Sequence, residues 1–159
     1  MKTSVLALSV CALVCSSSFS FAANQDTTQF NIKITIKETC NISSQEASDI
    51  DFGSINRSSS DVSAQGNLNV TCTSGTPYNI ALKSNRVMSN SLSSSSSIPY
   101  MLYQDSAQNV VWGTDSSSAY TNTGNGSTQQ IGVWGKVFSQ NTNVPAGSYA
   151  DTVTAVISY

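Results

Sequence analysis

Apolar and polar residues alternate most regularly near the start of the chain, in residues 28–40. The large apolar side chains of this stretch occupy every second position: Phe30, Ile32, Ile34 and Ile36. Because successive side chains of an extended strand point to opposite faces, this spacing places all four on one face. The positions that alternate with them are polar and include Lys33 and Lys37. The pattern predicts an amphipathic strand just ahead of Cys40.

The remaining chain is typical of short strands divided by polar turns, without helical periodicity. Further strands are predicted over residues 67–73, 77–83, 100–103, 110–113, 131–138 and 149–159, with an irregularity at Gly135. The last of them places four side chains on one face: Val153, Ala155, Ile157 and Tyr159. Residues 89–97, nearly all serine, and residues 114–128 are predicted to be loops. These elements predict an all-β chain and favour an immunoglobulin-like β-sandwich.

The first 22 residues have the pattern of a secretory signal peptide. Lys2 supplies a positive start, residues 5–14 are an apolar run, and residues 20–22 offer small side chains for cleavage after Ala22. A membrane anchor is the alternative, but it requires roughly 20 apolar residues, about twice this run. We therefore expect export and no membrane span.

Charge argues against a nucleic-acid partner. Lys2 is the only charged residue among the first 22, so the exported chain keeps six basic residues against nine acidic ones, a net charge of −3. It contains no run of Lys or Arg that could neutralise a phosphate backbone.

Two cysteines remain after export, Cys40 and Cys72, because Cys11 and Cys15 belong to the signal peptide. In an exported chain such a pair is expected to form a disulfide. Metal binding is the alternative, but the chain has no histidine and no second cysteine pair to complete a ligand set. No metal site and no cofactor are expected.

Several short motifs together resemble the spore coat protein U domain family, whose best-understood members are subunits of archaic (Csu-type) chaperone–usher pili. The similarity covers nearly all of residues 30–159 through motifs in a matching order: the alternating segment before Cys40, Asp51-Phe52-Gly53, residues 69–73, Pro77-Tyr78, residues 80–82, residues 100–103, Trp112-Gly113, residues 133–137 and residues 146–153. Each motif is weak alone, and their order and spacing make the resemblance specific.

The resemblance implies an incomplete immunoglobulin-like sandwich that lacks its last strand. A periplasmic chaperone would lend a strand, and an outer-membrane usher would replace it with the N-terminal segment of a neighbouring subunit. The resemblance assigns the donor role to the four alternating apolar residues and the disulfide to Cys40 and Cys72. It places the acceptor groove, which also faces the chaperone, along Val153, Ala155, Ile157 and Tyr159. The implied organisation is a signal peptide (1–22), a donor segment (23–37) and a sandwich domain (38–159).

Other functions stay open at this point. An enzyme is disfavoured, since the chain lacks histidine and any close acidic pair beside a nucleophile. A carbohydrate-binding or adhesive module, or a coat-like surface protein, fits the same fold, because fold does not decide function. Trp112 and Trp134 are interpreted as core or groove-lining aromatics rather than sugar platforms. Residues 30–36 are either a donated strand or the ordinary first strand of a complete sandwich. The preferred hypothesis is a structural pilus subunit, exported through the periplasm to the cell surface, that supports attachment and biofilm formation.

Overall fold

The computed structural model describes residues 24–43, 48–90 and 96–159. The chain divides into two units, Met1–Thr35 and Ile36–Tyr159. The predicted signal peptide lies outside the described residues, so its assignment remains a prediction. In the described part of the chain, no helix has the length and hydropathy needed to cross a membrane.

Residues 24–39 contain no strand, although alternation predicts one over residues 28–40. A strand is defined by the ladder it forms with a neighbour, so alternation alone does not produce one. The four apolar side chains of this stretch are 80–86% exposed.

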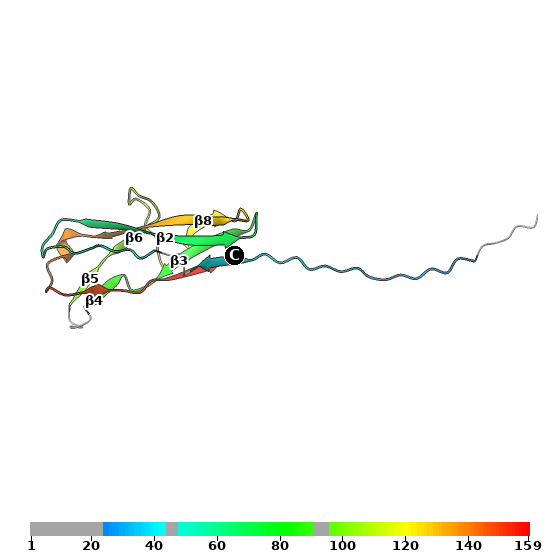
Figure 1. Cartoon of the computed structure of the whole chain (residues 1–159), viewed down its shortest axis with the longest axis horizontal. Coiled ribbons are helices and arrows are strands. Elements are labelled where there is room, and N and C mark those ends of the chain that lie inside the picture. Colours follow the sequence, from blue (N-terminus) through cyan, green and yellow to red (C-terminus); the bar gives the residue numbers. More distant parts are fainter. Residues whose placement is uncertain (1–23, 44–47, 91–95) are drawn as a thin grey trace, which may run out of the picture. The chain divides into compact units, whose positions relative to one another are not determined.

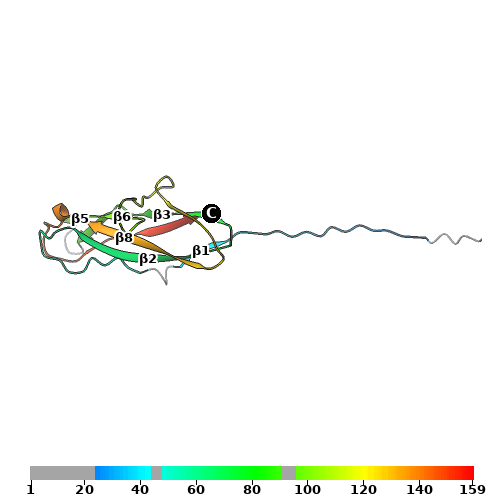
Figure 2. The same ribbon diagram turned by 90° about the horizontal axis from the view of Figure 1, so that it is seen from above.

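The second unit is all-β, apart from the single 3-10 turn η1 (Ser139–Asn141) in its described part (Figures 1 and 2). One sheet has the order β1 (Cys40–Ser43), β2 (Val62–Cys72), β8 (Thr128–Val137) and β6 (Met101–Tyr103). A second sheet has the order β10 (Thr154–Ser158), β3 (Pro77–Lys83) and β7 (Tyr120–Thr123). A third, smaller sheet has the order β5 (Ser97–Pro99), β4 (Val87–Asn90) and β9 (Tyr149–Ala150). All strand pairs are antiparallel.

The sheets enclose one core, which confirms the predicted immunoglobulin-like sandwich. Its fully buried side chains come from both larger sheets and the segments between them: Val70, Ile80, Leu102 and Trp112. The longest strand pair around the core is β2–β8, in which the paired residues run from Val62↔Val137 to Thr71↔Thr128. Side chains of β8 alternate without a break through Gly135, so the irregularity predicted there is wrong.

Trp112 connects the two layers of the sandwich. Its indole N–H donates to the Ile80 carbonyl of β3 at 2.7 Å, and its backbone N–H donates to the Leu102 carbonyl of β6 at 2.8 Å. Trp134 instead lies half-buried on the other face of β8, where its ring covers Gly132. The prediction of a core aromatic is therefore confirmed for Trp112, whereas Trp134 lies outside the core.

Several predicted element boundaries are wrong. β2 begins at Val62 rather than at residue 67, and the ends of the predicted loop 89–97 belong to β4 and β5. Residues 110–113 form an isolated bridge, Tyr103↔Val111, instead of a strand, because Asp105 accepts backbone N–H bonds from Asn109 and Val110 and holds a loop there. β7 lies inside the predicted loop 114–128, where pairing with β3 overrides the polar composition. The predicted strand 149–159 is divided into β9, which pairs with β4, and β10, which pairs with β3.

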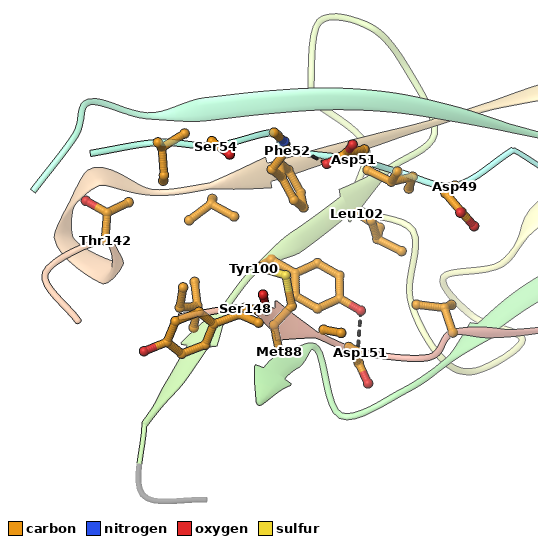
Figure 3. Close-up of a pocket in the computed structure, with 18 of the residues that line it drawn as sticks. Asp49, Asp51, Phe52, Ser54, Met88, Tyr100, Leu102, Thr142, Ser148 and Asp151 are labelled. Atoms are coloured by element: carbon orange, nitrogen blue, oxygen red, sulfur yellow. Dashed lines mark hydrogen bonds between the residues drawn. The ribbon is translucent and has the colours of Figure 1, made fainter. Parts of the chain in front are cut away.

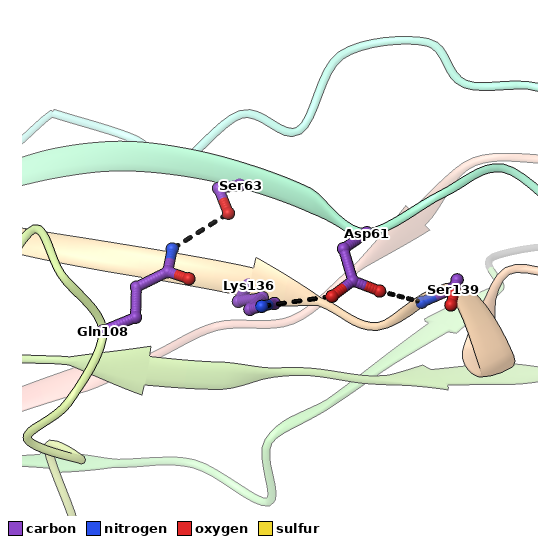
Figure 4. Close-up of polar contacts among 5 residues, drawn as sticks. All are labelled: Asp61, Ser63, Gln108, Lys136 and Ser139. Atoms are coloured by element: carbon purple, nitrogen blue, oxygen red, sulfur yellow. Dashed lines mark hydrogen bonds and ion pairs between the residues drawn. The ribbon is translucent and has the colours of Figure 1, made fainter.

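Asp61 joins the start of β2 to the turn after β8 (Figure 4). Its carboxylate accepts the backbone N–H of Ser139 at 2.9 Å and lies 3.1 Å from the Lys136 ammonium. The Ser139 hydrogen bond, followed by the Lys136 hydrogen bond, lowers the pKa of Asp61 below its ordinary value of 3.8. The ionised form is therefore favoured in the folded state.

We expect Asp61→Asn to lower the melting temperature slightly near neutral pH. A depressed folded-state pKa stabilises the fold above the unfolded pKa of 3.8, and this contribution is lost as the pH falls through the lower folded value. The difference between wild type and variant should therefore shrink as the pH falls below 3.8. Thermal melts near neutral pH and in acid below this value would measure it. An equal difference at the two pH values would show that the charge of Asp61 is irrelevant to stability.

Candidate functional site

Two of the edge strands in the described part of the sandwich, β1 and β10, are the first and last strands of the chain. Within the described residues, β10 pairs with β3 and β1 pairs with β2, and neither has a second strand partner. β1 and β10 approach one another in space. The sandwich is thus open between its first and last strands, and unpaired backbone groups of an edge strand favour pairing with another strand.

A groove lies next to the start of β10 (Figure 3). Its first wall is residues 48–57 and its second wall is residues 144–155. The first wall forms no strand. It is attached to β2 at Ser48, whose backbone N–H donates to the Asn67 carbonyl at 3.1 Å and whose hydroxyl donates to Asn67 Oδ1 at 2.7 Å.

The floor of the groove is the core of the domain. It is formed by apolar side chains from five strands: Leu82, Met88, Ile98, Leu102, Val133 and Val137. The cavity has a volume of about 710 Å³. Several large apolar side chains are needed to fill such a space, so the groove is suited to an extended apolar segment.

Two glycines allow the first wall to lie close to the sheet. A Cβ atom at Gly66 of β2 would lie 2.8 Å from Ile50 Cγ1, and one at Gly135 of β8 would lie 2.8 Å from Phe52 Cζ. Both distances are far shorter than a van der Waals contact. Glycine at these positions therefore lets Ile50 and Phe52 cover one side of the open core.

A hydrogen bond joins the floor of the groove to its second wall (Figure 3). The Tyr100 hydroxyl donates to Asp151 Oδ2 at 2.6 Å and is 3.2 Å from Ser84 Oγ. Burial, reinforced by the Asp151 hydrogen bond, raises the pKa of Tyr100 above 10.0. Asp151 follows β9 directly, so this bond holds the chain where the second wall turns from β9 towards β10.

Two of the four residues predicted to form the acceptor groove line the groove of the structure. Val153 and Ala155 line the groove. Ile157 is half-buried against the core, and Tyr159, beyond the end of β10, is 62% exposed. Their predicted acceptor role remains a prediction.

Sequence reasoning did not identify the first wall or the floor as parts of the site. The only signal was the Asp51-Phe52-Gly53 motif, which entered as part of the family resemblance. Phe52 proves to be a wall residue, and Gly53 has a positive φ of 69° with its N–H bonded to Asp51 Oδ1 at 2.8 Å. Of the six floor residues, Leu82, Leu102, Val133 and Val137 belong to predicted strands, whereas Met88 and Ile98 do not. Nothing in the spacing of these residues shows which core side chains line a groove.

The disulfide between Cys40 and Cys72 is present. The two residues are direct partners in the β1–β2 register, with Cα atoms 4.1 Å apart. The bond fastens the short β1 to the longest strand of the sandwich. Over the described ranges, no group of three or more His, Cys, Asp and Glu residues is placed to hold a metal ion.

Comparisons with known proteins agree with this geometry. The sequence model of the Spore Coat Protein U domain matches residues 26–156. No curated protein matches the chain. Among solved structures, a chain of the CsuC–CsuE chaperone–tip adhesion subunit pre-assembly complex, from archaic chaperone–usher Csu pili of Acinetobacter baumannii, matches with 22% identity and a TM-score of 0.53. The match covers 79% of this chain and only 40% of that one, and at this identity it shows a shared fold.

Proposed function

Because this chain belongs to the Spore Coat Protein U domain family, we propose that it is a structural subunit of a bacterial surface pilus. In this proposal the N-terminal segment of one subunit fills the groove of the next by donor-strand exchange. A periplasmic chaperone protects the groove beforehand, and an outer-membrane usher assembles the fibre at the cell surface. No catalysis is part of this role, which is to build a fibre for attachment and biofilm formation.

The observation that carries the proposal is that the domain has an open groove and the N-terminal segment has an exposed row of alternating apolar side chains. Core residues of both layers line the groove, and Phe30, Ile32, Ile34 and Ile36 are 80–86% exposed. Burying four such side chains is worth at most about 6–12 kcal/mol, before the backbone hydrogen bonds that a paired strand adds. Head-to-tail donation does not close on itself, so it produces a filament.

The proposal predicts polymers that survive SDS without heating and dissociate on boiling. We would purify the mature chain with its periplasmic chaperone, release it, and compare unheated and heated samples on SDS gels. The full chain should give a ladder, and a chain lacking residues 23–37 should not.

Two single variants sharpen the test. Ile34→Asp should abolish the ladder, because it brings a charge into the apolar groove. Thr35→Asp carries the same charge on the opposite face and should keep the ladder. If the full chain and the shortened chain both remain stable monomers, the sandwich is complete by itself, and an adhesive or coat-like role takes the place of the pilus role.

A further inference from the structure

The mouth of the groove is acidic at one end. Asp49 and Asp51 lie on the first wall and Asp151 on the second, and all three are exposed (Figure 3). Arg57 is the one basic residue in the groove lining, and its Nε donates to Asn143 Oδ1 at 2.7 Å. Asn143 adjoins Thr142, which lies at the opposite end of the groove from Asp49 in Figure 3.

The N-terminal segment has the opposite charge on its outward face. Lys33 and Lys37 alternate with the apolar residues, so in a docked strand they point away from the floor and towards the mouth. Four residues of extended chain separate them by about 13 Å, so Lys33 lies at the middle of the segment that the groove accepts, residues 30–36, and Lys37 lies directly beyond its end.

We propose that the acidic mouth recognises these lysines, and that the preferred occupant of the groove is therefore the N-terminal segment of a second copy of this chain. The inference rests on the proposed function and adds partner choice to it. The apolar floor accepts many strands in which apolar and polar side chains alternate, since it selects only for the size and spacing of the apolar side chains. The charges at the mouth distinguish a donor with outward lysines from one with outward carboxylates.

The charges act mainly on the rate of docking. Complementary charged surfaces accelerate association by about 10–1,000-fold, and salt reduces the effect. Self-assembly of the chain should therefore slow as ionic strength rises, while the strength of the finished contact depends on the apolar floor.

Two full-length charge-reversed chains test the proposal. The first carries Lys33→Glu and Lys37→Glu, which gives it an acidic segment and an acidic mouth. The second carries Asp49→Lys and Asp151→Lys, which gives it a basic segment and a basic mouth. Each chain alone should form the SDS-stable ladder at least about tenfold more slowly than wild type in low salt. An equal mixture should recover the wild-type rate, because each segment then meets a mouth of opposite charge.

The mixture also controls for misfolding, since a misfolded chain is not rescued by a partner. Lys83→Glu, an exposed site at the end of β3 outside the groove lining, is the matched reversal and should leave the rate unchanged. If both reversed chains form the ladder at the wild-type rate while Ile34→Asp still forms none, the charge recognition is overturned. Donor-strand exchange is then left intact. Slow assembly in the mixture, or wild-type assembly only with a different subunit, would overturn it as well. Absence of any wild-type ladder would overturn the proposed function together with this inference.

Discussion

Replacing Trp112 with alanine is expected to lower the free energy of unfolding by about 3–5 kcal/mol. The side chain is fully buried, and its ring centroid lies 5.3 Å from that of Tyr120. Its backbone carbonyl also accepts a hydrogen bond from Arg86 Nη2 at 3.0 Å. A cavity at this position therefore loosens contacts with both layers. Since small domains are stable by about 5–15 kcal/mol in total, the variant should be close to unfolding at ordinary temperature.

Trp134→Ala is the matched control. This tryptophan is half-buried on the outer face of β8, so its removal opens no cavity in the core. We expect it to cost less than half as much as Trp112→Ala. Urea unfolding followed by far-ultraviolet circular dichroism would measure both. Equal losses would show that Trp112 is not the link between the layers.

Removing the disulfide is expected to have the second-largest effect on stability. The bond closes a loop of 32 residues, for which the chain-entropy model gives roughly 3–4 kcal/mol. The effect should be concentrated at β1, which has only four residues and pairs on one side with β2. Once β1 detaches, β2 loses its neighbour on this side of the sheet.

The measurement compares wild type with Cys40→Ser/Cys72→Ser in urea, each with and without a reductant. Reductant should shift the wild-type midpoint towards that of the variant and leave the variant unchanged. The variant should also form fewer SDS-stable polymers, because a frayed β1 perturbs one end of the groove. A wild-type midpoint that does not respond to reductant would contradict the role of the bond.

The groove would give the proposed partner a direct contact with the core. Its floor is made of core side chains, so apolar side chains that fill the groove would pack against the core itself. This burial of apolar surface supplies the free energy for binding a strand. In the proposed pilus, the burial of apolar side chains in the groove stabilises each subunit and also holds neighbouring subunits together.

Much of this architecture follows from local pattern. Alternation identified β3 with its bounds and most of β8, because a strand buried on one face requires period two. The cysteine count led to the Cys40–Cys72 bond, since only two cysteines remain after the predicted signal peptide. The alternation of residues 30–36 was also visible, together with the lysines that alternate with its apolar residues, Lys33 and Lys37.

The tertiary structure decided which of these segments pair or pack against one another. Polar β7 became a strand only because β3 offered it an edge, and residues 149–159 divided because β4 and β3 each paired with one part. The groove could not be predicted, because its walls depend on two glycines, Gly66 and Gly135, that let residues 48–57 lie against the sheet. The fold places Asp49 and Asp51 in the same groove as Asp151, which lies about a hundred residues later in the chain. Local sequence determines which face of a strand is apolar, whereas the pairing of distant strands determines which apolar faces remain uncovered.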